Sequence, residues 1–439
     1  MAFGEKILEY KDDILKTLAE VVAIDSVSAE GSEKPQQALE LMLNTARKMG
    51  LTAENFDNLA GHIQYGNGKK LCGVLTHLDV VPSGQGWSVE PFKLTRKDGR
   101  LYGRGVADDK GSAVVALYCL KALKDNGIEA DSTVRLILGT NEETGMTDVE
   151  HYFSKMPVPD VSFTPDSDYG ICNCEKGILQ FSLTGKNNSS VITNAKAGCA
   201  VNAVPDKAKF ILEEIENGEF VEEFLNLEDN VLVSTGTASH AMEPHKGFNS
   251  VTHAIKKLKA VYNSDNLGDI PEFINKYIGT GTDGKLLGIN CSDEQSGELT
   301  INVGVLDINE STATAKIDIR YPVTADYEEI VDKIKKSAEN YNLEFKVESH
   351  LPPLNVPENS SIISTLQTAY KEITGKLPDL YSTGGGTYAR SLGNKGVAFG
   401  PVFPDDYSNM HKADESLNEE KFFLHAQICL EAIYRMFTE

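Results

Sequence analysis

The spacing of hydrophobic residues predicts helices and strands that alternate along the first part of the chain. Apolar residues recur at helical intervals over 7–22 and 39–49, which predicts two amphipathic helices. A strand over 61–65, a turn at 66–68 and an apolar run from residue 71 then predict a β-hairpin. A capping-box sequence at 147–150 marks the start of a later helix. This order of elements is typical of an α/β domain.

Acidic or imidazole side chains lie next to the ends of several predicted elements. They are His77 and Asp79 after the strand from residue 71, Asp108 and Asp109 before a helical segment, Glu142 and Glu143 after a strand over 134–138, and Asp166 and Asp168 after a strand over 161–164. The carboxyl ends of parallel strands meet at one edge of a sheet. We therefore expect a functional site at this edge.

From about residue 178 the pattern changes to alternating strands with helices between them. Strands over 299–306 and 314–321, joined through Asn309-Glu310-Ser311, predict a second hairpin. Helices are predicted over 251–261, 271–278 and 325–341. This pattern predicts an α+β unit at 180–352, inserted into an α/β domain formed by 1–179 and 353–439. The length of the insert predicts two lobes.

Composition narrows the classes of function. The 439 residues include 42 Lys and Arg against 65 Asp and Glu, a net charge of −23, so nucleic acid is not an expected partner. No apolar run approaches the length of a membrane span, and the N-terminus lacks the apolar core of a signal peptide. Seven cysteines, scattered through apolar contexts, are typical of a reducing compartment. We therefore expect a cytoplasmic protein with no membrane partner.

His77 and Asp79 are spaced for a metal ligand and the group that orients it. Side chains two apart on a strand point to the same face, and a carboxylate beside a ligating imidazole fixes its tautomer. A surface His at the end of a strand is the alternative. For Asp108 and Asp109 the alternative is a simple helix N-cap, because Asp is a favoured capping residue.

Glu142 and Glu143 are adjacent after a buried strand. In a surface turn the two carboxylates would repel each other and gain nothing. Beside a dication, one can bind the metal while its neighbour takes a proton from the metal's water.

Four motifs together resemble a known family. They are His77-Leu78-Asp79-Val80-Val81-Pro82, GRGVADDKG at 103–111, Asn141-Glu142-Glu143-Thr144-Gly145 and Pro165-Asp166. They resemble the metal-site motifs of the M20 metallopeptidases, and more narrowly of the cytosolic dipeptidase (PepV-like) branch, over nearly the whole chain. The resemblance implies a dinuclear zinc hydrolase with a zinc-peptidase-like α/β catalytic domain that is interrupted by an α+β lid domain.

The resemblance also implies a set of metal ligands, which are His77, Asp108, Glu143, Asp166 and His411. Asp108 would bridge the two ions, His77 and Asp166 would complete one site, and Glu143 and His411 the other. Nitrogen and oxygen donors suit zinc, and manganese or cobalt is tolerable. Tyr169-Gly170 stands where the family commonly has an aromatic residue and a proline, so Asp168 remains an alternative to Asp166.

Further roles follow from the same resemblance. Glu142 would be the general base, with Asp79 holding His77 from behind. His240 would donate to the scissile carbonyl, although a lone loop His is often just solvated. Arg320 would bind the substrate carboxylate, since its planar fork suits that task. Asn202 is a candidate for the same pocket.

Three successive glycines, Gly384, Gly385 and Gly386, allow positive φ angles and close backbone approach, so their amides are candidates to face an anion. A nucleotide phosphate loop is the rival interpretation, but the Gly-Lys-Ser/Thr ending is missing. The resemblance implies a substrate carboxylate site instead.

The expected function is hydrolysis of small dipeptides with a free C-terminal carboxylate by a water activated between two metals. An N-acyl amino acid deacylase or desuccinylase would use the same metal core. A non-catalytic two-domain binding protein would keep the cleft but could discard the base, whereas Glu142 is present. Because a two-lobed lid could supply His240 within one chain, we expect a monomer.

Overall fold

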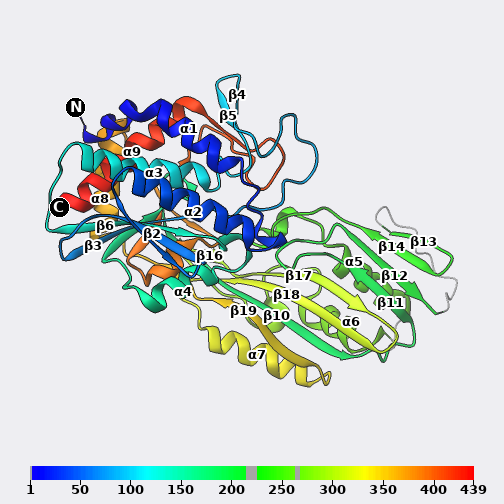
Figure 1. The fold of residues 1–439 in the computed structure, drawn as a ribbon. Coiled ribbons are helices and arrows are strands. Elements are labelled where there is room, and N and C mark those ends of the chain that lie inside the picture. The colour runs from blue at the N-terminus through cyan, green and yellow to red at the C-terminus, as the bar shows by residue number, and fades with distance from the viewer. Residues whose placement is uncertain (1, 214–224, 263–266) are drawn as a thin grey trace. The chain divides into compact units, whose positions relative to one another are not determined.

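The computed structural model describes residues 2–213, 225–262 and 267–439 (Figure 1). The chain divides into two compact units. The first comprises Met1–Cys174, Leu354–Tyr381 and Gly386–Glu439, and the second comprises Glu175–Pro353 and Ser382–Gly385. The first unit is thus built from segments that precede and follow the second unit along the sequence.

A nine-stranded sheet organises the first unit. Its order is β1-β2-β6-β3-β7-β22-β9-β20, with β21 paired to β9. The strands are β1 (Thr52–Phe56), β2 (Ala60–Gly66), β3 (Lys70–His77), β6 (Ser132–Gly139), β7 (Val161–Thr164), β9 (Ile171–Glu175), β20 (Leu354–Asn355), β21 (Leu380–Thr383) and β22 (Gly396–Ala398). The central strands β6, β3, β7 and β22 run parallel. Their carboxyl ends therefore meet at one edge of the sheet.

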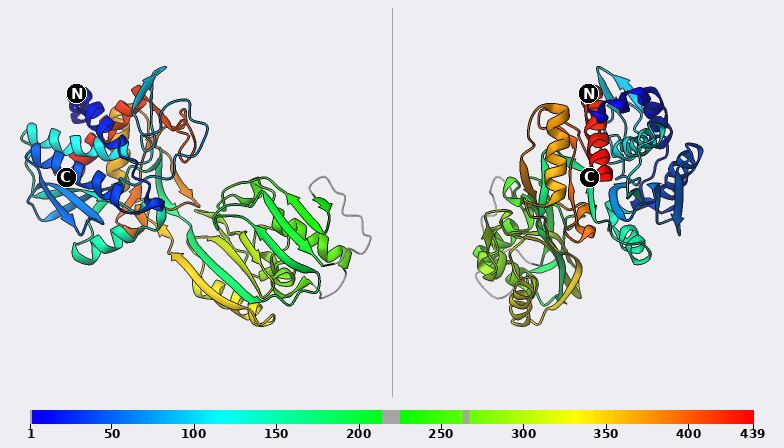
Figure 2. Two further views of the ribbon diagram at one scale, coloured as in Figure 1. Left: turned by 45° about the vertical axis from the view of Figure 1, so that its right-hand side comes forward. Right: turned by 90° about the vertical axis from the view of Figure 1, so that its left-hand side faces the viewer.

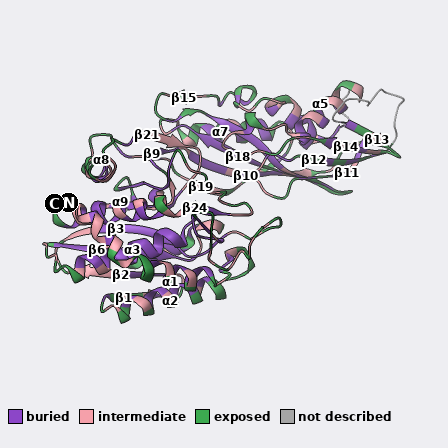
Figure 3. Ribbon diagram, turned by 90° about the horizontal axis from the view of Figure 1, so that it is seen from above, coloured by how far each residue is buried: buried purple, intermediate pink, exposed green. Residues whose placement is uncertain are grey.

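Helices cover both faces of this sheet. They are η1 (Phe3–Tyr10), α1 (Lys11–Val22), α2 (Glu33–Lys48), α3 (Lys110–Asp125), α4 (Thr147–Lys155), α8 (Ser361–Thr374) and α9 (Glu419–Thr438). On one face Val74 and Leu136 share a core with α3 and α9, while on the other Leu75 and Ile137 pack with Tyr152 of α4. Figure 3 shows α3 almost wholly buried. This arrangement of layers confirms the predicted α/β class.

Two local predictions in this unit are wrong. The strand over 61–65 does not form a hairpin with the run from residue 71, because β6 lies between β2 and β3; β2 pairs with β1 instead. The capping box at 147–150 does not form, since the Thr147 hydroxyl donates to Asn141. Helix α9 is capped by Asn418, whose side chain accepts from the amide of Lys421.

The second unit is built on one eight-stranded antiparallel sheet with the order β13-β14-β12-β11-β17-β18-β10-β19. Figure 2 shows its strands side by side in green and yellow. The strands are β10 (Gly177–Lys186), β11 (Ile192–Ala197), β12 (Lys207–Leu212), β13 (Leu225–Glu228), β14 (Val231–Thr235), β17 (Thr300–Ile308), β18 (Thr312–Tyr321) and β19 (Glu344–Leu351). The predicted hairpin is confirmed as β17 and β18.

Helices α5 (Ser250–Tyr262), α6 (Asp269–Phe273), η6 (Ile274–Ile278) and α7 (Tyr327–Glu339) accompany this sheet, and they share one hydrophobic cluster with its strands. The predicted α+β class of this unit is confirmed. Eight of its described strands join in one sheet, and β15 (Ser292–Asp293) and β16 (Gly297–Glu298) pair separately. The two lobes stay a prediction. In the described parts of the chain, no helix combines the length and apolarity that a bilayer crossing requires. The seven cysteines all lie in the described parts of the chain, and none of them forms a disulfide.

Candidate metal centre

The candidate ligands of the first unit come from segments at the carboxyl edge of its sheet. His77 is the last residue of β3, Glu142 and Glu143 begin the short helix η3 (Glu142–Thr144) after β6, and Asp166 follows β7. Asp108 precedes α3. Because β3, β6 and β7 run parallel, these side chains are delivered to one place, as the sequence predicts.

Asp108 lies between two imidazoles. Its Oδ1 is 2.9 Å from Nε2 of His77, and its Oδ2 is 2.8 Å from Nε2 of His411. Nε2 of His411 is also 3.3 Å from Oε2 of Glu143, and Nε2 of His77 is 3.7 Å from Oδ2 of Asp166. The five predicted ligands are thus brought together around one shared carboxylate.

The chemistry of this cluster fits a cation. The ligand atoms of His77, Asp108 and Glu143 all lie within 4.8 Å of one another. Oε1 of Glu143 is buried without a hydrogen-bond partner, and a buried polar atom without a partner is costly. Nitrogen and carboxylate donors of this kind suit zinc and other divalent transition metals.

The carboxylates also repel one another in a way that a cation would relieve. Burial, together with the charge of Asp108, raises the pKa of Asp166 to about 8. Burial raises the pKa of Glu143, and that of Glu142 lies well above its usual range. Burial opposes ionisation of Asp108 as well, but hydrogen bonds from His411 and His77 lower its pKa. The cluster therefore concentrates negative charge that a metal would neutralise.

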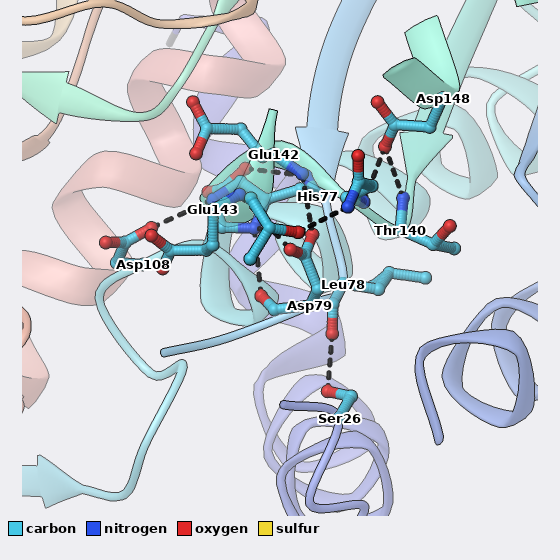
Figure 4. Close-up of polar contacts among 12 residues, drawn as sticks. Ser26, His77, Leu78, Asp79, Asp108, Thr140, Glu142, Glu143 and Asp148 are labelled. Atoms are coloured by element: carbon cyan, nitrogen blue, oxygen red, sulfur yellow. Dashed lines mark hydrogen bonds and ion pairs between the residues drawn. The ribbon is translucent and has the colours of Figure 1, made fainter. Parts of the chain in front are cut away.

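Asp79 holds the turn that carries the two glutamates. Its Oδ1 accepts from the amide of Glu142 at 3.1 Å and its Oδ2 from the amide of Glu143 at 3.2 Å (Figure 4). Nδ1 of His77 lies 2.9 Å from the carbonyl oxygen of Asp79 and 3.5 Å from its carboxylate. The nearer acceptor for the imidazole is therefore the carbonyl, and the carboxylate chiefly positions Glu142 and Glu143.

A second buried carboxylate, Asp148, holds the residues just before this turn. Its Oδ2 accepts from the amide of Thr140 at 2.6 Å (Figure 4). The same oxygen accepts from the amide of Asn141 at 2.7 Å and from the hydroxyl of Tyr388. From the sequence, Asp148 is predicted only as part of a capping box. Tyr388, two residues after the glycine run, has no role in the sequence-based prediction. A tyrosine at this place was the sequence feature from which a hydrogen-bond partner for a buried carboxylate could have been predicted.

Asp168 is separated from the cluster. It lies in the short strand β8 (Ser167–Asp168), which pairs with β23 (Pro401–Val402), and its side chain is exposed. Asp166, in contrast, is close to His77. The geometry therefore favours Asp166 over Asp168. Asp109 caps no amide of α3; its Oδ2 accepts from the amide of His77 at 3.2 Å.

Arg320 lies in β18 of the second unit and is almost fully buried. Its Nε and Nη2 donate to the carboxylate of Asp318 at 2.6 and 2.9 Å, and its Nη1 donates to the carbonyl of Gly384 at 2.9 Å. A guanidinium has five N–H donors, so two of them are left for another acceptor.

The His240 loop lies near the same group. Thr300, which is opposite Arg320 on β17, donates to the carbonyl of Ala241 at 3.3 Å. The amide of Ala241 donates to the carbonyl of Asn202 at 2.9 Å. Nδ1 of His240 accepts from the amide of Met242 at 3.1 Å, which leaves the proton of the neutral ring on Nε2. His240 is exposed.

The glycine run departs from expectation. None of Gly384, Gly385 and Gly386 has a positive φ angle, so the run does not use that conformational freedom, and its role in binding an anion stays a prediction. The amide of Gly385 donates to Oγ1 of Thr383 at 3.1 Å. A Cβ on Gly384 would lie 2.8 Å from Cβ of Met242, so close approach to the His240 loop is what this glycine permits. Gly386 belongs to the first unit.

Comparison with known proteins gives the family. The sequence model of peptidase family M20/M25/M40 matches residues 73–435. The chain is 36% identical over 465 residues to a Bacillus subtilis (strain 168) protein named "Putative dipeptidase YtjP", covering 99% of this chain and 100% of the relative.

Two solved structures share the fold. One is the M20 family metallo-carboxypeptidase Sso-CP2 from Sulfolobus solfataricus, with a TM-score of 0.64, 19% identity, and coverage of 96% of this chain and 99% of that one. The other is the Bacillus subtilis YXEP protein, described as a dinuclear metal-binding M20 peptidase, with a TM-score of 0.56, 10% identity, and coverage of 98% and 99%. The predicted resemblance is confirmed at the level of the family: this chain belongs to peptidase family M20/M25/M40.

Proposed function

We propose that this peptidase is a metal-dependent dipeptidase of the cytoplasm that cleaves small dipeptides with a free C-terminal carboxylate. The observation that carries the proposal is the shared carboxylate of Asp108, which lies 2.9 Å from His77 and 2.8 Å from His411 with Glu143 and Asp166 beside it. A carboxylate between two imidazoles is suited to bridge two cations.

In this proposal His77, Asp108, Glu143, Asp166 and His411 hold two divalent ions, with zinc as the metal best suited to the donors. When bound, the ions supply an acidified water and polarise the scissile carbonyl. Asp108 would be shared by the two positions, His77 and Asp166 would complete one of them, and Glu143 and His411 would complete the other.

Glu142 is proposed as the general base and then as the acid that protonates the leaving amine. Its raised pKa means a high affinity for a proton, and neighbouring cations would bring that pKa back toward the working pH, where a base is most effective. Asp79 and Asp148 keep its backbone in place through three amides of the same turn and the segment before it.

The second unit is proposed to bind the substrate. Arg320 offers two N–H groups to the C-terminal carboxylate, with Asn202 and the glycine run Gly384–386 in supporting roles. His240, with its proton on Nε2, donates to the developing oxyanion. A peptide with a blocked C-terminus would lose the charge-assisted bond to Arg320.

The test is a substrate panel for the metal-loaded enzyme, with dipeptides, tripeptides, C-terminally amidated dipeptides and N-acyl amino acids. The proposal expects free dipeptides to be hydrolysed best, and metal content near two ions per chain by elemental analysis. Preferential cleavage of N-acetyl or N-succinyl amino acids would identify a deacylase instead. Glu142→Gln, prepared identically, controls for contaminating peptidases. Light scattering tests the expected monomer.

A further inference from the structure

A buried ion pair, formed by Glu415 and Arg104, contacts segments that carry the candidate ligands. Both side chains are 1% exposed, and Nη1 of Arg104 donates to Oε2 of Glu415 at 2.6 Å. Neither residue has a role in the proposed function. The pair lies entirely within the first unit.

The other oxygen of Glu415 accepts from three backbone amides of the Asp108 segment. Its Oε1 lies 3.0 Å from the amide of Gly105, 2.9 Å from that of Ala107 and 3.2 Å from that of Asp108 itself. The carbonyl of Glu415 also accepts from the amide of Gly103 at 3.1 Å. One side chain thus fixes the backbone from which the shared carboxylate projects.

Glu415 also belongs to the segment that carries His411, four residues earlier. It therefore ties together, through backbone contacts, the two segments whose side chains meet at 2.8 Å between Asp108 Oδ2 and His411 Nε2. Because these two segments are 303 residues apart in sequence, no local structure sets their separation.

Arg104 extends the connection to the segment after His77 and Asp79. Its Nη2 donates to the carbonyls of Pro82 at 3.2 Å and Ser83 at 3.3 Å. Trp87 Nε1 donates to the same Ser83 carbonyl at 2.7 Å, and the Arg104 guanidinium lies 5.3 Å from the Trp87 ring centre. Trp87 is the single tryptophan of the chain.

Stability alone is a poor reason to bury such a pair, because desolvation of two charges can exceed their attraction, and apolar replacements are often as stable. An apolar side chain, however, cannot accept from three amides. We propose that Glu415, neutralised by Arg104, is a positioning residue that holds Asp108 and His411 at the separation needed to bind the metals. This rests on the proposed function only in requiring that the cluster binds metal.

The test titrates metal-free protein with Zn²⁺ by calorimetry. Removing groups that orient metal ligands typically weakens binding about 10–100-fold, and we expect Glu415→Gln to raise the metal dissociation constant by that factor. Glu431→Gln is the matched control, since Glu431 is also buried, pairs with Arg435 at 2.8 Å and accepts from the amide of Gly4. It should bind metal as the wild type does.

Two further measurements keep the test decisive. Glu415→Asp retains the charge that Arg104 requires but shortens the side chain, so it should fold, bind metal less tightly and alter the Co²⁺ absorption spectrum. Emission from Trp87 should change in both Glu415 variants and stay at the wild-type position in Glu431→Gln.

Wild-type dissociation constants in both Glu415 variants would overturn the inference, as would an equal weakening in Glu431→Gln. If the wild type binds two ions but cleaves no dipeptide, the proposed function fails and the inference still stands on the calorimetry. If the wild type binds no metal, both fail.

Discussion

Replacing Glu142 and Glu143 one at a time by glutamine separates two roles that the proposed mechanism gives to neighbouring side chains. Oε2 of Glu143 lies 3.3 Å from His411, and its Oε1 is buried without a partner. In Glu143→Gln one of these oxygens becomes an NH2 group, which cannot bind a cation, and a negative charge is lost from the cluster. Metal affinity should therefore fall at least tenfold, and activity with it.

Glu142→Gln should have the opposite profile. The five proposed ligands stay intact, so metal content should remain near the wild-type value. The amide cannot accept the proton of the attacking water, and a positioned acid or base contributes about 10²–10⁴-fold. Turnover should fall at least about 10²-fold, which corresponds to about 2.7 kcal/mol in the barrier.

The metal-free enzyme gives a third readout that does not depend on activity. Burial raises the pKa of Glu142 well above its usual range, so near neutral pH its ionised form opposes folding when no cation is present. A neutral glutamine removes this cost. In excess chelator, Glu142→Gln should unfold at a higher temperature than the wild type.

Elemental analysis, dipeptide hydrolysis and thermal unfolding of both variants complete the assay. Loss of metal in Glu142→Gln with retention in Glu143→Gln would reverse the assignment. Full activity in Glu142→Gln would refute the general-base mechanism.

Three other predictions concern substrate binding and stability. Arg320→Ala should lower dipeptide turnover by about tenfold or more, since a hydrogen bond to a charged group contributes about 1.5–3 kcal/mol; equal cleavage of amidated and free dipeptides by the wild type would contradict this. Tyr388→Phe removes a buried donor to Asp148 and should lower the unfolding free energy by about 1.5–3 kcal/mol in urea titrations; an unchanged midpoint would contradict it. Burial lowers the pKa of His425 to about 3, below its unfolded value of about 6.5. The neutral His425 thus stabilises the fold at neutral pH, and the advantage of metal-free wild type over His425→Gln should shrink as pH falls below about 6.5; a constant difference between pH 7 and 5 would contradict this.

Four of the candidate ligands, His77, Asp108, Glu143 and Asp166, lie next to a short local pattern that marks the end of a strand or the start of a helix, whereas His411 was identified only through the family resemblance. A buried strand that ends at His77, or one followed directly by Glu142 and Glu143, is visible within about ten residues of sequence. Parallel packing then brings such ends together without further information. The change in the pattern of elements near residue 178 could be predicted for the same reason, because the spacing of apolar residues changes there.

The failures involve contacts with residues outside the element that each local pattern describes. The hairpin after residue 66 was wrong because β6, which begins at Ser132, pairs with both β2 and β3. The capping box failed because Thr147 and Asp148 bond to Thr140 and Asn141 instead. Gly384 is placed by the carbonyl it offers to Arg320, 64 residues away. No local pattern reports such contacts.

Six carboxylates at and around the candidate metal centre divide into two kinds by their partners, although all are the same residue types in sequence. Asp79, Asp148 and Glu415 each accept from two or more backbone amides, so the folded chain itself satisfies their charge. Asp108, Glu143 and Asp166 lie close to one another and to two imidazoles, so a bound cation would neutralise their negative charge.

This division explains how the cluster can remain assembled while its ligands repel one another. The amide-bound carboxylates fix the backbone of the segments that carry the others, and hydrogen bonds of this kind contribute about 1.5–3 kcal/mol each. Because their backbone is fixed, the loops cannot move apart to reduce the repulsion between the ligands. It is then relieved when metal binds, which makes the binding of the cation the step that stabilises the finished site.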